Sequence, residues 1–173
     1  MSKRILFITR TSLLLAIAII SQFLGKFIGP HNNFIVGPIV NAILLVATHI
    51  TGILGGIIIS VVAPLVSALT NKAPIAPIIL AFSPFIIGGN IVYVLLYALI
   101  KNRNSILGIA VGSVVKAAFL YASVKAFLYF MKINEPVATT LTTLFSWPQL
   151  LTAVIGGAIA LAVIPAVKKV AAD

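Results

Sequence analysis

Acidic residues are almost absent from this chain, because only Glu135 and Asp173 carry side-chain carboxylates among 173 residues. Because Asp173 is the last residue of the sequence, these two groups cannot form a pair of catalytic carboxylates inside the membrane. Cysteine is missing altogether, which excludes disulfides and thiolate chemistry. The sequence also lacks G-x-S-x-G, H-E-x-x-H and P-loop motifs, so it offers no nucleophile elbow, zinc protease site or means of hydrolysing ATP. We therefore expect no enzyme activity and no cofactor.

Charged residues of both signs are scarce, at 8% of the chain, whereas hydrophobic residues make up 61%. Soluble domains usually carry about a quarter charged residues, so the composition predicts an integral membrane protein. The net charge of +10 is spread over short ends and loops, which is more typical of membrane topology than of nucleic-acid binding. The basic start Met1–Arg10 resembles a signal peptide, but no small-residue cleavage site follows it, so we expect a retained first span.

The uncharged runs are long enough to cross a bilayer, which takes about 20 helical residues. The run Phe27–Asn71 has no charged residue and suits two helices with a turn near His49–Gly52. We predict an all-α polytopic membrane protein in which residues 1–173 form a single integral-membrane domain. Its six transmembrane helices are expected over residues 5–27, 34–49, 52–70, 77–100, 105–131 and 146–167.

The distribution of basic residues predicts the orientation of these spans, because cytoplasmic loops are enriched in Lys and Arg. An even number of spans with both termini inside places seven basic residues inside and three outside. The inside set is Lys3, Arg4, Arg10, Lys101, Arg103, Lys168 and Lys169, and the outside set is Lys26, Lys72 and Lys132. His31 and His49 then fall on opposite sides, so no metal site is expected.

Lys116 lies inside the apolar stretch Asn104–Met131, which contains no acid. A charge at that depth is costly, so such residues mark substrate or ion pathways by default. Its natural counter-charge is a ligand carboxylate or phosphate, although a ring oxygen or nitrogen could also accept its hydrogen bond. The structural alternatives are backbone carbonyl partners or snorkelling, which mid-span depth makes difficult. Lys125, near the outer end, can snorkel readily.

Other polar side chains within the spans are few. Asn90 suits either an interhelical hydrogen bond or a ligand contact, and Asn41 is a weaker candidate. Ser123 follows Lys116 by seven residues, which returns it to the same helical face. Trp147 and Gln149 flank Pro148 at the start of the last span, where Trp147 suits either the interfacial aromatic belt or stacking on a ligand.

Small residues four positions apart predict faces where helices pack closely. These pairs are Ser12 and Ala16, Gly52 and Gly56, Gly108 and Gly112, and Gly156 and Ala160. Bundle packing explains most of them.

Two segments carry a resemblance to a known family. The segment Arg10–Ala18 is similar to an A-x-x-x-A motif on a first helix, with Ser12 in the first small position. The segment Phe145–Ala153 is similar to the start of the last helix in uncharacterised clostridial members. With six spans and no ATP-binding motif, the chain resembles the substrate-binding S-components of energy-coupling factor (ECF) transporters.

The resemblance implies that the whole chain is a substrate-binding domain in the cell membrane. Its first helix would dock on a transmembrane coupling subunit driven by two ATPase subunits. Its ligand, a vitamin or related micronutrient, would bind near the outer face. Carried onto this sequence, docking falls on Ser12 and Ala16, and ligand contact falls on Asn90, Lys116, Trp147 and Gln149, with Ser123 beside them. Metal-specific relatives carry a histidine near the N-terminus, and Met1–Arg10 has none.

Two functions of other classes remain open on the sequence alone. A self-sufficient secondary transporter normally needs a protonatable acid or an ion site at the midplane, and often inverted repeats, and neither is evident here. A membrane assembly protein would bind partner helices through small-residue faces and would not need a buried Lys116. Co-purification distinguishes these functions, because only an S-component brings down ATPases and a coupling subunit.

Overall fold

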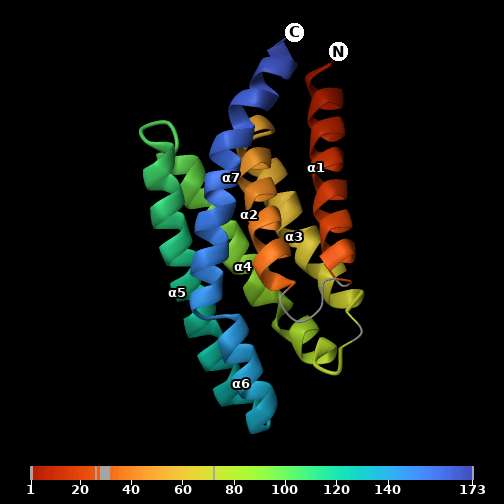
Figure 1. The fold of residues 1–173 in the computed structure, drawn as a ribbon, viewed down its shortest axis with the longest axis vertical. Helices are drawn as coiled ribbons and strands as arrows, with labels where there is room; N and C mark the ends of the chain where they lie inside the picture. The colour runs from red at the N-terminus through yellow and green to blue at the C-terminus, as the bar shows by residue number, and fades with distance from the viewer. Residues whose placement is uncertain (1, 26, 28–31, 72, 173) are drawn as a thin grey trace.

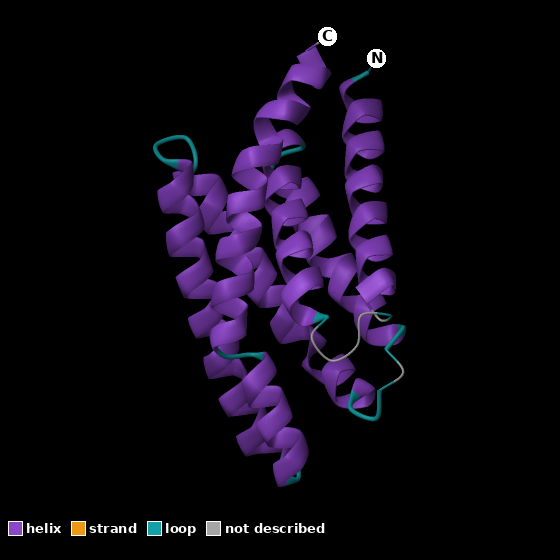
Figure 2. Cartoon of the chain, in the orientation of Figure 1, coloured by secondary structure: helices purple, strands orange, loops and turns teal. Residues whose placement is uncertain are grey.

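The structure is a computed structural model that describes residues 2–25, 27, 32–71 and 73–172. Lys26, His31, Lys72 and Asp173, which entered the sequence analysis, lie outside the described residues. The described part is helical, without strands (Figures 1 and 2). Its helices are α1 (Lys3–Gly25), α2 (Asn33–Ile50), α3 (Ile53–Leu69), α4 (Ala76–Ile100), α5 (Ser105–Met131), α6 (Glu135–Leu144) and α7 (Trp147–Ala172).

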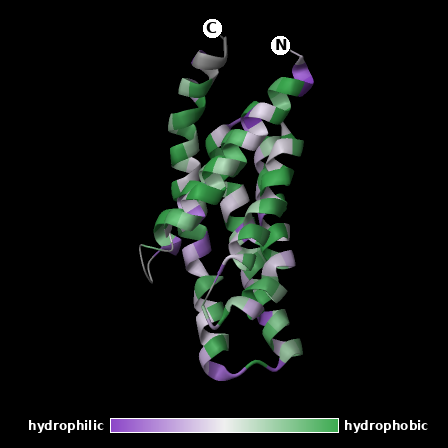
Figure 3. Ribbon diagram, turned by 90° about the vertical axis from the view of Figure 1, so that its right-hand side faces the viewer, coloured by the Kyte–Doolittle hydropathy of each residue, from purple (hydrophilic) through white to green (hydrophobic). Residues whose placement is uncertain are grey.

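Five helical stretches are long and apolar enough to cross a membrane, namely α1, α2, α4, α5 and the stretch Glu135–Val167 that includes most of α7. The apolar helix α3 is shorter, with 17 residues. Figure 3 shows apolar residues along most of the bundle. The prediction of an all-α polytopic membrane protein is thus confirmed. All predicted ends lie within two residues of the observed ones except that of the last helix, which extends to Ala172 because lysine is a good helix former.

The two termini lie at the same end of the bundle, as expected for an even number of crossings (Figure 1). The turn between α4 and α5, which contains Lys101 and Arg103, is at this end too. The charge rule makes this the cytoplasmic end. The opposite, outer end carries α6 and the end of α5.

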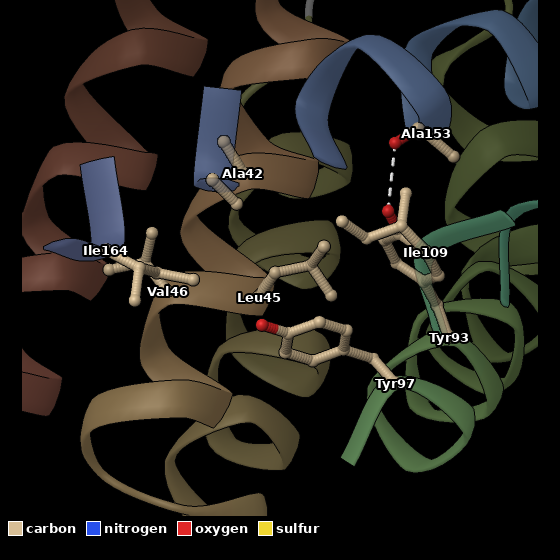
Figure 4. Packing of buried hydrophobic residues seen from close by; sticks show 9 residues of the cluster. Ala42, Leu45, Val46, Tyr93, Tyr97, Ile109, Ala153 and Ile164 are labelled. Carbon is tan, nitrogen blue, oxygen red and sulfur yellow. Dashed lines mark hydrogen bonds between the residues drawn. The ribbon is translucent and has the colours of Figure 1, made fainter. Parts of the chain in front are cut away.

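Helix α2 is the centre of the bundle, since every residue from Asn41 to Thr48 is buried. It packs most extensively against α7 and also contacts α1, α3 and α4. On the α7 side, Leu45 joins a core with Tyr93, Tyr97 and Ile109 (Figure 4). This arrangement leaves α1 at the edge, where α2 and α3 are the only described helices that it contacts.

Close packing depends on small residues. A Cβ atom at Gly112 would lie 2.8 Å from the Tyr93 ring, and one at Gly156 would lie 2.5 Å from the Asn41 Cβ atom. The predicted faces at these glycines are therefore packing faces. The prediction for Gly52 was wrong, because a Cβ atom at this position would meet no other atom within 4 Å. Gly52 is instead the N-cap residue of α3, with φ +83°. Glycine adopts this positive φ without the steric cost of a Cβ atom.

Helix α6 was not predicted. Its start carries recognisable signals, since Asn134 precedes the helix, Glu135 lies in the first turn and a proline follows. These signals were outweighed by the four threonines of the segment, because β-branched residues lower helix propensity. Three of these threonines donate to the carbonyl four residues back, at 2.8 to 2.9 Å: Thr140, Thr142 and Thr143.

Candidate functional site

Lys116 lies in the middle of α5 with 3% of its surface exposed. Its side-chain nitrogen donates a hydrogen bond to Asn41 Oδ1 on α2, at 2.5 Å. The same nitrogen stands 5.3 Å from the centre of the Tyr93 ring on α4. Three helices therefore enclose this amino group, and it does not reach either end of the bundle.

The partners of Lys116 are themselves held in place. The Tyr93 hydroxyl donates to the backbone carbonyl of Ala153 on α7 at 2.8 Å (Figure 4). Gly112 lets the Tyr93 ring approach α5, and Gly156 lets Asn41 approach α7. Both partners of Lys116, Tyr93 and Asn41, are thus positioned by close contact with a glycine.

No ion pair involves Lys116 within the part of the chain that the structure describes. Glu135 is exposed at the start of α6, at the outer end. An amide oxygen and an aromatic face are each worth about 2 kcal/mol to a buried cation. The burial of an ion costs several kcal/mol, so a protonated Lys116 remains short of negative charge. A ligand with an anionic or strongly accepting group would supply it.

Asn90 is 5% exposed and is level with Lys116 along the bundle. Gly89 packs on Leu120 of α5, and Tyr93 lies beneath the Lys116 nitrogen. Asn90 lies between Gly89 and Tyr93 in α4, so the antiparallel packing brings it to the same height. Its side chain has no hydrogen bond to any described residue.

The remaining predicted contacts lie farther out. Ser123 is partly buried and lies two turns beyond Lys116 on α5. Trp147 is 62% exposed, and its ring centre is 5.7 Å from that of Phe34. Trp147 precedes Ala153 by six residues, or about 9 Å of helix, so it is not part of the Lys116 cluster.

Gln149 has a structural contact. Its Nε2 atom donates to the backbone carbonyl of Leu144 at 3.0 Å, which joins the start of α7 to the end of α6. It stays near the turn between these helices rather than beside Lys116.

Ser12 and Ala16 are exposed on α1. The surface around them is apolar and includes Leu13, Ile17 and Ile20. A small-residue strip bordered by larger apolar side chains can receive a partner helix or lipid.

Sequence reasoning gave too little weight to Asn41 and Tyr93. An uncharged amide in an apolar span needs a partner just as a lysine does, and pairing the two would have been a usable signal. Nothing in the sequence marked Tyr93 as a core residue, since many tyrosines lie at the membrane interface, yet it is fully buried.

Comparison with known proteins finds no match among curated proteins or among solved structures. One family is found, described as "ECF transporter, substrate-specific component", and its model matches residues 6–167. The match spans every helix except the first three residues of α1 and the last five of α7. The chain is therefore a multi-pass membrane protein that belongs to the family of substrate-specific components of ECF transporters.

Proposed function

We propose that this substrate-specific component captures a small micronutrient, a vitamin or a vitamin precursor, at the outer face of the cell membrane. Uptake is powered by two separate ATPase subunits through a transmembrane coupling subunit. The family match supports the transport role. The absence of a P-loop from the sequence supports energy supplied by other subunits. Residues 1–173 act as one substrate-binding domain.

The observation that carries the substrate proposal is the buried Lys116, which has no carboxylate partner among the described residues. An accepting group of the substrate takes the Lys116 hydrogen bond in place of Asn41. Asn90, level with the lysine and without a described hydrogen bond, binds a second polar group. Ser123 lines the approach from outside, and Trp147 and Gln149 contact the substrate at the outer rim.

Docking on the coupling subunit uses Ser12 and Ala16 on α1. Their exposure supports this role, as does the position of α1 at the edge of the bundle. Without a hydrophobic drive between helices in lipid, association relies on close backbone approach at small residues.

The test is purification of the tagged chain from its native membrane, followed by mass spectrometry of both proteins and extracted small molecules. We expect a coupling subunit, two ATPases and one enriched small polar compound. A chain that supports uptake in vesicles without any ATPase would instead be a secondary transporter. Recovery of partner membrane proteins with neither ATPase nor ligand would indicate an assembly protein.

A further inference from the structure

A cavity of about 150 Å³ lies at the outer ends of α1, α2 and α3, apart from the Lys116 cluster. This volume corresponds to roughly five water molecules. Among the residues that the structure describes, its lining has one apolar side chain and five uncharged polar ones: Gln22, Asn32, Asn33, Val36, Ser67 and Asn71. Such a concentration of amides is unusual in a chain so rich in apolar residues.

Gln22 is the most informative of these residues. It is 9% exposed, and its Oε1 atom is buried without a hydrogen-bond partner. A buried acceptor without a donor is unfavourable, and native proteins retain few of them unless they serve a function or bind a water or ligand. A ligand N–H or O–H group in this cavity would supply the missing donor.

Two asparagines complement this acceptor. Asn71 Oδ1 accepts from the backbone N–H of Ala73 at 2.9 Å, which fixes the amide and leaves its Nδ2 group as a donor. Asn32 occupies the N-cap position of α2, where asparagine normally binds a backbone N–H, yet its side chain makes no capping hydrogen bond. Both amides line the cavity.

The cavity and the Lys116 cluster lie on different sides of α2. Asn33 lines the cavity together with residues of α1 and α3, whereas the next residue, Phe34, contacts Trp147 of α7. Asn41, deeper on α2, contacts Lys116 of α5. A ligand in the cavity would therefore not touch the lysine.

We propose that this cavity is a second binding site, which takes a small uncharged molecule with adjacent hydrogen-bond donors and acceptors, such as a ring amide. The donor of the ligand bonds to Gln22 Oε1, and its carbonyl accepts from the Asn71 amide. The described lining residues offer amide donors and acceptors but no charge, so a small uncharged polar molecule is the ligand that they fit.

Binding of uracil, 2-pyridone and nicotinamide to the purified full chain tests this site, with benzoate as the anionic ring control. We expect ring amides to bind in preference to benzoate. Gln22→Met should weaken that binding by about tenfold or more, since it removes a hydrogen-bonding group that only the ligand satisfies. Gln149→Met, which changes the other glutamine, and Lys116→Met should leave it unchanged.

Equal binding to Gln22→Met and the unchanged protein would overturn the proposal, as would a preference for benzoate or no ring-amide binding at millimolar concentration. Gln22→Met should also melt no lower than the unchanged protein, because it removes an unpaired polar atom. If this variant does not fold, Ser67→Cys decides the matter.

The chain has no cysteine of its own, so a polar thiol reagent reports on Ser67→Cys alone. We expect this cysteine to react, and uracil to slow the reaction. Ser60→Cys, fully buried on the same helix, is the matched control and should not react. Reaction of Ser67→Cys at the same rate with and without each ring amide would overturn the proposal.

Discussion

Lys116 and Asn41 form a hydrogen bond across the centre of the bundle, although 75 positions separate them in the chain. Both side chains are buried, each with 3% exposure, and neither is paired with an acid in the described structure. Breaking this bond leaves two polar groups in an apolar interior, so whatever replaces it must offer hydrogen bonds of its own. We therefore propose that the pair selects among substrates by the hydrogen bonds that they offer.

Replacement of Lys116 tests that selectivity. Lys116→Met keeps the length of the side chain and should weaken binding of the ligand extracted from the protein by one to two decades. The lost charge-assisted hydrogen bond is worth about 1.5–3 kcal/mol. Lys125→Met is the control, because Lys125 is exposed with its nitrogen 5.6 Å from the Tyr121 ring. Calorimetric titration that gives Lys116→Met the affinity of the unchanged protein would make Lys116 a structural lysine.

A bulky residue on α1 tests the docking surface. Ala16→Trp should leave ligand affinity nearly unchanged, because Ala16 is exposed on α1, and α1 makes no contact with the lysine-bearing α5 in the described part of the chain. Uptake should be lost and co-purification with the coupling subunit weakened, since a large side chain holds a partner helix away. Uptake at the original rate would mean that the docking surface lies elsewhere.

Replacing either of two glycines by alanine should change the stability of the bundle in opposite directions. Gly156→Ala places a Cβ atom 2.6 Å from the Pro38 carbonyl oxygen and 3.0 Å from the Ala42 nitrogen, both of which belong to the backbone. We expect it to destabilise the bundle by about 1–3 kcal/mol through overpacking. Gly108→Ala meets no atom closer than 3.4 Å and should be neutral or stabilising, since alanine favours helix. Thermal unfolding in detergent compares them, and equal melting temperatures would contradict the close contact.

Orientation can be tested with single cysteines, because the chain has none. Ser2→Cys and Asn102→Cys should react with an impermeant reagent only after the cells are opened. Asn134→Cys, at the turn before α6, should react in intact cells. Labelling of Ser2→Cys from outside would reverse the topology.

The six spans could be predicted because the signal is local. Long uncharged runs end at charged or polar residues, and α5 starts at Ser105 and ends at Met131 as expected. The first residues of α5 are also fixed locally, since Asn104 Oδ1 accepts from the Leu107 N–H at 3.0 Å.

The candidate site could be predicted only in part, because it depends on how each helix is rotated. In water, an apolar stripe marks the buried face, but in lipid the outer face is apolar as well. Lys116 could therefore be found from depth and charge alone, whereas its pairing with Asn41 could not. For the same reason, the sequence could not decide between the aromatic belt and ligand stacking for Trp147, which is 62% exposed.

The length of α3 has a consequence for the membrane itself. Its 17 residues rise about 25 Å, less than the roughly 30 Å of a hydrocarbon core. This hydrophobic mismatch must be met by a locally thinner bilayer or by water that reaches below the headgroups. The polar residues that follow α3, Thr70 and Asn71, lie where that adjustment occurs at the outer end. We therefore expect the thickness of the membrane to affect how well the neighbouring cavity is hydrated.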